Sequence, residues 1–202
     1  MKIVNGQTLS SKEIQDFITN GTQVFQRITV TDHLSFSGQD IKLSLAFFDS
    51  EFLGGFTCIN TDFGSTFRIT RTTVNGDVYL ESNIKSFVLI NSSVIKGFLS
   101  LERAEIEGNL YIVDTEITSD LSLSVAKIQG SLYLNETKVK TLNLLSTYIG
   151  GILHFLKLET EEISVRQEMA QRVHLAAPIA PLAVFPPGIS REHYTDFIQW
   201  DI

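Results

Sequence analysis

The sequence predicts a mainly β fold: a solenoid of parallel strands with about 22 residues in each coil and four short faces, an N-terminal capping helix and a helical C-terminal tail. Three observations support this prediction. An eleven-residue pattern of apolar residues repeats through residues 32–150, a small residue recurs at one place in it, and the composition changes on both sides. With 202 residues and 43% hydrophobic content, the chain can bury a full core.

The repeat is clearest in residues 108–118, GNLYIVDTEIT, where Leu110, Ile112 and Ile117 occupy positions 3, 5 and 10. Every unit has apolar residues at these three positions, a regularity that chance does not explain. The pair at positions 3 and 5 predicts a short strand, because alternate residues of a strand share a face. The units begin at Asp32, Leu43, Gly54, Ser65, Gly76, Ser86, Gly97, Gly108, Ser119, Gly130 and Thr141, and those at Gly76 and Thr141 are one residue short.

Position 8 is small in every unit after the first, which has Gln39 there. A small side chain two residues before the apolar position 10 predicts a tight corner whose interior has room for one bulky group. An eleven-residue coil would be too narrow for three large side chains, so we expect two units in each coil and coils stacked about 4.8 Å apart. The small residues are Ser50, Thr61, Thr72, Ser82, Ser93, Ala104, Thr115, Ala126, Thr137 and Thr147.

Residues 1–31 predict an N-terminal cap and the strand that enters the solenoid. Ser10 and Glu13 form a capping-box pattern, followed by an apolar helical face and an Asn-Gly stop. A short helix here would cover the first coil and prevent further strands from adding to its edge. The segment after it, TQVFQRITVT, predicts the entering strand, with Ile28 and Val30 pointing inward.

Residues 166–202 predict a tail that differs from the solenoid at 32–165. The repeat weakens after Gly151, Ile163 and Val165 predict a last strand, and RQEMAQRVHLAA then fits a helix. All the prolines lie in this tail, and the chain ends in an aromatic helical face. The tail is either a C-terminal cap or an arm for docking and homo-oligomer formation. The aromatic residues that would make this contact are Tyr194, Phe197 and Trp200.

Composition and motifs disfavour several classes of function. The net charge of −7 disfavours direct nucleic-acid binding, and no apolar run is long enough to span a membrane. Cys58 is the single cysteine and occupies an inward position 5, so we expect a buried structural thiol. The histidines have no metal-ligand spacing, and no catalytic, Walker or dinucleotide motif occurs. We therefore expect a cytoplasmic, non-enzymatic protein without a cofactor or metal.

The spacing of the apolar residues resembles that of the pentapeptide-repeat proteins, in a degenerate form. Positions 5 and 10 match the central residue of the family's five-residue unit, and position 8 matches the small residue two before it. One extra residue, often Gly, enters every second pentapeptide, and the match covers residues 32–150. This resemblance implies a right-handed, quadrilateral parallel β-helix.

Position 4 lies between the inward pair and is expected to face solvent. With two units in each coil, Leu89, Tyr111 and Tyr133 stack in one outward column, after Ala46 and Arg68. A flat apolar stripe of this kind is a candidate protein-binding surface. Packing within the ladder itself is the alternative interpretation.

Glu105, Asp114 and Glu116 belong to an acidic stretch, residues 102–120, and form a second candidate binding site. A solvated face would explain such a stretch. The family resemblance implies a different explanation, because some pentapeptide-repeat rods imitate duplex DNA and bind type II topoisomerases.

The function that these observations favour is a non-enzymatic protein-binding or scaffold module, bacterial or phage-borne, with a protein partner. The first alternative is a DNA-mimic binder of a type II topoisomerase or another DNA-binding protein. The second is a stand-alone effector or anti-defence binding protein, since the recognition modules of bacterial HECT-like ubiquitin ligases also use a β-helix of this general kind.

Overall fold

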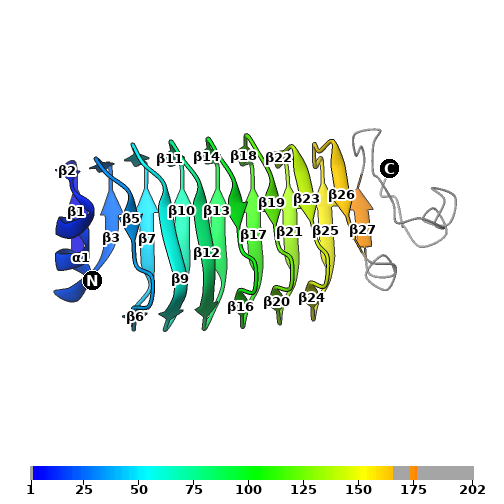
Figure 1. The fold of residues 1–202 in the computed structure, drawn as a ribbon, viewed down its shortest axis with the longest axis horizontal. Helices are drawn as coiled ribbons and strands as arrows, with labels where there is room; N and C mark the ends of the chain where they lie inside the picture. The colour runs from blue at the N-terminus through cyan, green and yellow to red at the C-terminus, as the bar shows by residue number, and fades with distance from the viewer. Residues whose placement is uncertain (1, 166–172, 177–202) are drawn as a thin grey trace, which may run out of the picture.

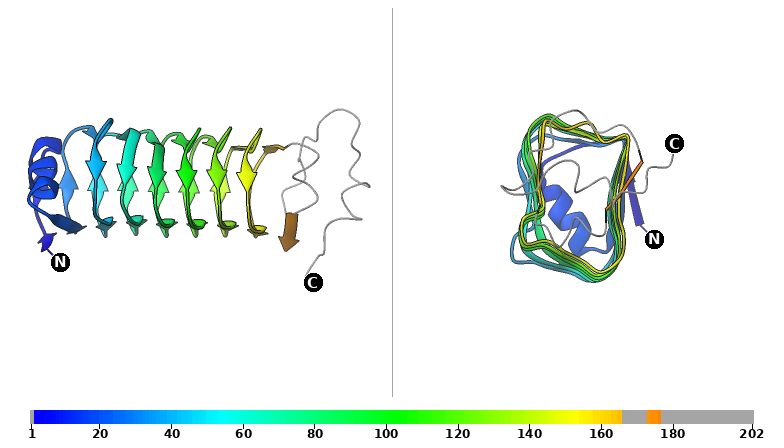
Figure 2. Two further views of the ribbon diagram at one scale, coloured as in Figure 1. Left: turned by 90° about the horizontal axis from the view of Figure 1, so that it is seen from below. Right: turned by 90° about the vertical axis from the view of Figure 1, so that its right-hand side faces the viewer.

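The computed structural model describes residues 2–165 and 173–176, and in them the chain winds into a parallel β-solenoid of about seven coils (Figure 1). Seen along its axis, the solenoid has a four-sided outline (Figure 2). Leu110 pairs in parallel with Val88 and with Leu132, so one coil takes about 22 residues. The predicted coil length and parallel stacking are therefore confirmed.

Three parallel sheets form the four faces. Sheet A makes one whole face and contains β1 (Lys2–Asn5), β3 (Thr22–Gln26), β7 (Leu45–Phe48), β10 (Phe67–Thr70), β13 (Val88–Asn91), β17 (Leu110–Val113), β21 (Leu132–Asn135), β25 (Leu153–Leu156) and β27 (Val173–Ala176). Sheet B makes the next face and contains β2 (Thr8–Leu9), β4 (Thr29–Val30), β8 (Glu51–Phe52), β11 (Thr73–Val74), β14 (Val94–Ile95), β18 (Glu116–Ile117) and β22 (Lys138–Val139).

Sheet C bends around a corner and makes the other two faces, called C1 and C2. Two long strands, β9 (Phe56–Phe63) and β12 (Val78–Ile84), run through both faces and join them. C1 also contains β5 (Leu34–Ser35), β15 (Leu99–Ser100), β19 (Leu121–Ser122), β23 (Thr141–Asn143) and β26 (Glu162–Ser164). C2 also contains β6 (Asp40–Ile41), β16 (Glu105–Ile106), β20 (Lys127–Ile128) and β24 (Tyr148–Ile149).

The apolar residues at positions 3, 5 and 10 all point into the solenoid, and none is more than 5% exposed. The core also continues where the sequence pattern weakens. Leu153, Phe155 and Leu158 are buried after Gly151, so the expected loss of register at that point is wrong. Ile163 and Val165 extend the core by another step, as predicted.

The corners explain why position 8 is small. The residue before it, at position 7, has a positive φ in nearly every unit, which turns the chain sharply. The hydroxyls of Thr61, Ser82 and Thr147 then donate to backbone carbonyl groups of the coil below, at 2.6–2.8 Å. A Ser or Thr at position 8 is therefore small enough for the corner and also satisfies a buried acceptor. In β12 no residue has a positive φ, and this accounts for the short unit at Gly76.

Position 1 is often Gly because neighbouring coils approach closely there. A Cβ on Gly97 would lie 2.8 Å from the carbonyl carbon of Gly76 and 2.5 Å from Oδ1 of Asp77. Real side chains do not reach such distances, so the coil below would have to move.

Helix α1 (Ser11–Thr19) lies across the N-terminal end of the core (Figure 2). Ser10 caps it, and its backbone amide donates to Glu13 at 2.8 Å, which confirms the predicted capping box. Ile14 is fully buried, and Phe17 meets Phe25 edge to face at 6.4 Å. The helix thus covers apolar side chains that the first coil would otherwise expose.

Two features of the ends differ from the sequence predictions. Strands β1 and β2 precede the helix, because the chain first makes half a coil, and the entering segment forms two strands, β3 and β4. In the predicted helical tail, Val173–Ala176 form β27, which pairs with β25 in parallel. The rest of residues 166–202 lies outside the described residues.

The core changes in character along the axis. Rings pack on rings in the first coils; Phe56, for example, lies 5.5–6.1 Å from four other phenylalanine rings. From β11 onward the inward residues are almost all Leu, Ile and Val. The buried phenylalanines of the first coils are Phe25, Phe36, Phe47, Phe52, Phe56, Phe63 and Phe67.

Candidate functional site

The outer face of sheet A carries the predicted stripe. The strand register places Leu89 beside Tyr111 and Tyr111 beside Tyr133, as the predicted coil length indicates. His154 continues the column on β25. The structure therefore brings the three predicted residues together on adjacent strands.

The rings of the two tyrosines stack face to face. The rings of Tyr111 and Tyr133 are stacked with centroids 4.9 Å apart and planes 11° from parallel. The ring of His154 is 5.7 Å from Tyr133, and its Nδ1 is 2.8 Å from Oδ1 of Asn135. Because the ring faces are occupied, the column offers ring edges and polar tips to a binding partner. The stacking also stabilises the ladder, so ladder packing and partner binding are compatible roles.

Phe87 and Arg68 extend this surface in the N-terminal direction. Phe87 meets Tyr111 edge to face at 6.2 Å, and the guanidinium carbon of Arg68 lies 4.8 Å from the Phe87 ring centroid. We call Arg68, Phe87, Leu89, Tyr111 and Tyr133 the sheet A stripe. Phe87 did not stand out in the sequence, although it occupies the outward position 2 beside an inward Val88 and could have been found by that alternation.

Apolar side chains continue beside the stripe. They project outward at position 6 of the sheet A strands, and Ile152, at the turn before β25, is 42% exposed. The apolar position 6 residues are Phe48, Val113 and Leu156, which are half-buried. In the same column they alternate with Thr70, Asn91 and Asn135, so the stripe lies on a face where apolar and polar side chains are mixed.

Not every position 4 residue faces solvent, contrary to the sequence prediction. On face C1, Ser100 and Ser122 point outward but are buried, because Glu81 and Glu102 lie over them. Each serine hydroxyl donates to the covering carboxylate at 2.7 Å. The small side chain leaves space that a longer neighbour fills.

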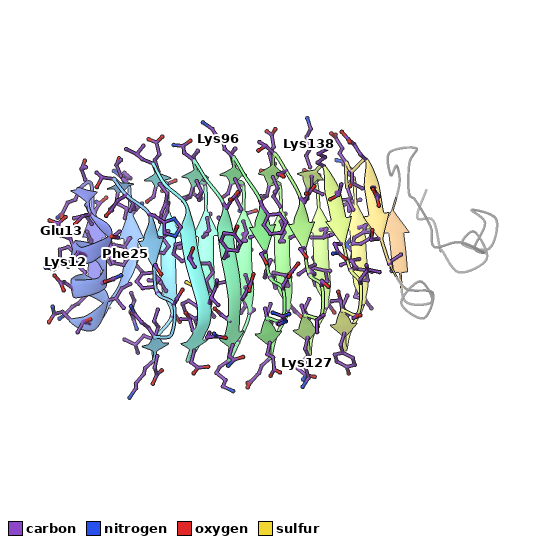
Figure 3. The ribbon with its side chains drawn as sticks, in the orientation of Figure 1. Lys12, Glu13, Phe25, Lys96, Lys127 and Lys138 are labelled. Carbon is purple, nitrogen blue, oxygen red and sulfur yellow. The ribbon has the colours of Figure 1, made fainter. Side chains whose placement is uncertain are left out.

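The acidic candidate residues do not form one patch. Residues 102–120 span almost one full coil, so their side chains are distributed around the solenoid. Glu105 lies on C2 beside Lys127, Asp114 lies at the corner between sheets A and B, and Glu116 lies on sheet B beside Lys138. Figure 3 shows Lys127 and Lys138 on opposite sides of the solenoid.

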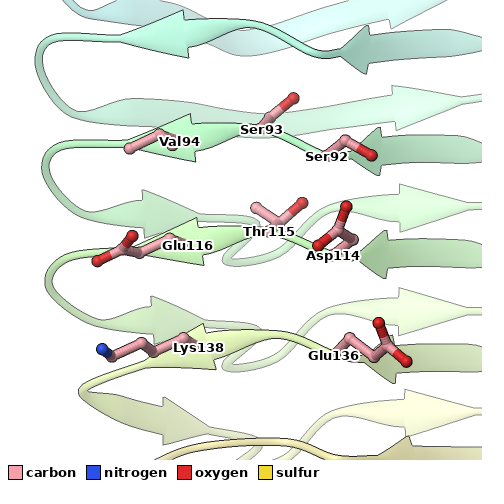
Figure 4. Close-up of a pocket in the computed structure, with 8 residues that line it drawn as sticks. All are labelled: Ser92, Ser93, Val94, Asp114, Thr115, Glu116, Glu136 and Lys138. Carbon is pink, nitrogen blue, oxygen red and sulfur yellow. The ribbon is translucent and has the colours of Figure 1, made fainter.

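A groove of about 320 Å³ runs along the corner between sheets A and B, where Asp114 and Glu116 lie (Figure 4). Several of its polar side chains have partners within the protein. Thr115 donates to the Val113 carbonyl at 2.8 Å, and Glu136 forms an ion pair with Lys157 at 3.0 Å. The residues that line it are Ser92, Ser93, Val94, Asp114, Thr115, Glu116, Glu136 and Lys138. This lining has neither a histidine nor a cysteine for covalent or proton-transfer chemistry.

The potentially reactive side chains lie apart. Cys58 is fully buried in the core, and burial raises the pKa of its thiol well above the ordinary value, so the neutral thiol predominates. Nε2 of His33 is 2.8 Å from Oγ1 of Thr57 on C1, whereas His154 lies on sheet A. Within residues 2–165 and 173–176, no group of three or more His, Cys, Asp and Glu residues could hold a metal ion.

Tyr194, Phe197 and Trp200 lie outside the described residues. No helix within the described part of the chain is long and apolar enough to cross a membrane. Comparison of the chain with protein-family models, with curated proteins and with solved structures found no match. The geometry of the solenoid surface is therefore the basis for the functional proposal.

Proposed function

We propose that this protein is a non-enzymatic protein-binding or scaffold module whose partner docks on the outer face of sheet A. The observation that carries the proposal is the sheet A stripe. Its aromatic and aliphatic side chains are half-buried on the outside of a solenoid whose core is already complete without them. Aromatic residues and Arg are the side chains most enriched at the centres of protein interfaces.

The ladder makes this surface well suited to binding. Arg68, Leu89, Tyr111 and Tyr133 sit on strands held on both sides by neighbouring coils, and Phe87 directly precedes β13. Stacking fixes Tyr111 and Tyr133 further. A partner would therefore lose little side-chain entropy when it binds here, because these side chains are already ordered.

The size of the face predicts the strength of binding. From β7 to β25 the face measures roughly 24 Å along the axis and 13 Å across, from the spacing of strands and residues. That footprint is well below the area of about 800 Å² that each partner buries in a standard interface. We therefore expect either transient binding or a partner that also contacts the flanking corners.

DNA mimicry is the second candidate, and face C1 is the surface that favours it. C1 displays carboxylates in its described strands or close to their ends; the strands themselves contain no Lys or Arg, although Arg103 and Lys140 lie close to strand ends. From β12 to β26 they are spaced roughly one per 4 Å along the axis, whereas duplex DNA has one charge per 1.7 Å or so. The charge density is thus less than half that of DNA, so we rank this function second. The carboxylates are Asp77, Glu81, Glu102, Asp120 and Glu162.

We also propose that the coil is right-handed and that the chain is a degenerate relative of the pentapeptide-repeat proteins, acting in the cytoplasm. The alternating spacing of five and six residues supports the relationship. The general preference of parallel strands for right-handed crossovers supports the hand. An experimental structure would test both.

Affinity capture from a bacterial lysate, with quantitative mass spectrometry, tests the main proposal. The wild type is compared with a Leu89→Ser, Tyr111→Ser, Tyr133→Ser variant whose fold is verified by circular dichroism. A matched control replaces Tyr79 and Phe98, whose rings lie 6.1 Å apart on face C1, with Ser. We expect a partner that is retained by the control and lost by the triple variant. A partner retained by the triple variant and lost by the C1 control would contradict docking on sheet A.

A further inference from the structure

Strand β10 holds two polar groups that the protein leaves without partners. Arg68 and Thr70 are two residues apart on β10, so both side chains lie on the outer face of sheet A. Nε of Arg68 and Oγ1 of Thr70 are the two buried side-chain polar atoms that lack a hydrogen-bond partner in the described part of the chain. Such atoms are rare in folded proteins, and each one needs an explanation.

Arg68 is held in place by packing rather than by an acid. Its guanidinium carbon lies 4.8 Å from the Phe87 ring centroid, and its ladder neighbours are Ala46 and Leu89. By contrast Arg71, three residues later, binds Asp49 through two nitrogen atoms at 2.5 and 3.1 Å. No ion pair in the described residues involves Arg68. The cation of the sheet A stripe is therefore unpaired, although carboxylates lie close by in the sequence.

We propose that Arg68, supported by Phe87, binds through its guanidinium group a carboxylate of the protein partner that docks on sheet A. This inference rests on the proposed function and specifies the chemistry of the partner. A guanidinium group has a planar fork of N–H donors that matches a carboxylate, and its planar face can remain on an aromatic ring while the fork is occupied. Apolar surroundings strengthen such a charge-assisted hydrogen bond.

A carboxylate fits this place better than a phosphate does. One cation balances one negative charge, and the ladder neighbours Ala46 and Leu89 and the ring of Phe87 have no side-chain hydrogen-bond donor, while Thr66 offers a single neutral hydroxyl. A dianion would leave excess charge beside apolar side chains of a protein whose net charge is −7. The partner chemistry is thus an Asp or Glu side chain, or a chain terminus, surrounded by apolar groups.

The strand register also sets the spacing of the partner's groups. Leu89 lies one strand from Arg68 and Tyr111 lies two strands away, or roughly 5 and 10 Å along the axis. A partner that satisfies the whole stripe therefore presents its carboxylate at one end and an apolar or aromatic patch starting about 5 Å away.

The test uses 3-phenylpropionate, a small molecule that joins a carboxylate to an apolar ring, and follows the arginine Nε–H signals of the full-length protein by NMR. We expect the Arg68 signal to shift and saturate with a Kd on the order of a few millimolar, as the size of the ligand allows. Arg27 and Arg103 are exposed arginines at corners of the solenoid and report non-specific anion binding. The uncharged 3-phenylpropionamide is the matched control ligand.

Variants locate the site. Arg68→Met should abolish the saturable shifts of neighbouring backbone amides, and Arg68→Lys should weaken binding because the ammonium group lacks the planar fork of donors. Tyr79→Ser, on face C1, should leave carboxylate binding unchanged and shows that the solenoid tolerates the loss of an outer aromatic ring.

Saturable, carboxylate-dependent shifts that Arg68→Met removes would support the inference. It is overturned if Arg68 shows no saturation up to the solubility limit of the ligand, if the amide binds equally well, or if the corner arginines respond in the same way. If the carboxylate titration fails but the triple variant still loses its partner in affinity capture, the proposed function stands and only the carboxylate site is rejected. Conversely, a positive titration with unchanged capture by the triple variant would keep the carboxylate site and reject the proposed function.

Discussion

The first and last coils of the solenoid place their aromatic residues on opposite sides of the same backbone. Before β11 the phenylalanines are mostly in the core, as with Phe56 among its four ring neighbours. From β12 onward the rings are mostly outside, as with Tyr111 and Tyr133, and the core is aliphatic. Phe48 and Phe155 are the exceptions in the two halves.

This difference indicates that the inner aromatic rings serve folding and the outer aromatic rings serve binding. The strand spacing and the inward positions are the same in both halves, so the last coils show that Leu, Ile and Val suffice to fill the solenoid. The outer aromatic residues of these coils are therefore not needed for the core. Changes to the inner rings should affect stability, whereas changes to the outer rings should mainly affect binding.

The largest expected effect is on the inner rings. Replacing Phe56 with Ala should lower the free energy of unfolding by about 3–5 kcal/mol, because the change removes a buried ring and leaves a cavity among other rings. Denaturant titration followed by circular dichroism measures this loss. Tyr133→Ala is the matched control on the outside, with an expected loss of about 1 kcal/mol or less. Equal losses for the two variants would contradict the separation of folding from function.

A smaller loss of stability is expected at position 1, where adjacent coils approach each other closely. Gly97→Ala should destabilise the protein by about 1–3 kcal/mol, because the added Cβ would overlap the backbone of Gly76 in the coil below. Ser119 occupies position 1 of the next coil at the same corner and already carries a Cβ, so Ser119→Ala should change little. Thermal unfolding of the two variants provides the comparison, and a tolerated Gly97→Ala would show that the coils are less closely packed there.

A stabilising change is expected at a corner of the last coils. Val125 has a φ of 61° and is 55% exposed, so a β-branched residue is held in the left-handed region with little packing in return. Val125→Asn should raise the free energy of unfolding by about 1 kcal/mol, since Asn tolerates this conformation better. Ser146, which occupies the same corner one coil later with a φ of 60°, supplies the control Ser146→Asn. A destabilised Val125→Asn would indicate that the exposed valine contributes through packing.

The smallest expected effect is electrostatic and belongs to the first coils. The hydrogen bond from Arg71 holds the pKa of Asp49 below its ordinary value in the folded protein. The pair therefore contributes stability above the carboxyl pKa of the unfolded chain, and this contribution disappears as the pH falls through the folded-state pKa. Asp49→Asn should lose less stability on acidification than the wild type, as measured by urea midpoints across the acidic range. Identical acid dependence in both proteins would show that this exposed pair contributes nothing measurable.

The repeat could be predicted from sequence because burial inside a solenoid acts on every coil in the same way. It specified the inward residues from Leu34 to Ile149, the coil length and the contact between Tyr111 and Tyr133. It did not show that Glu105 and Glu116 lie on different faces, because closeness in the sequence means little when every coil encircles the axis. The strands before α1 were missed since a partial coil contains too few repeats to form a pattern.

The sequence also could not predict that Arg68 has no acidic partner. Arg68 was visible in the outward column, but its lack of an acidic partner depends on Asp49 turning to Arg71 instead. Asp49 contacts Arg71 because both residues occupy position 7, at the same corner of successive coils. Spacing in the sequence does not distinguish a paired arginine from an unpaired one.

Photocrosslinking in cells of the source organism tests the central claim most directly. A photoreactive phenylalanine derivative is placed at position 89 on sheet A, and at position 79 on face C1 in a matched protein. We predict that the protein labelled at position 89 crosslinks to a partner and that the protein labelled at position 79 does not. Crosslinking from position 79 alone, or from neither position, would contradict the proposal that sheet A is the docking face.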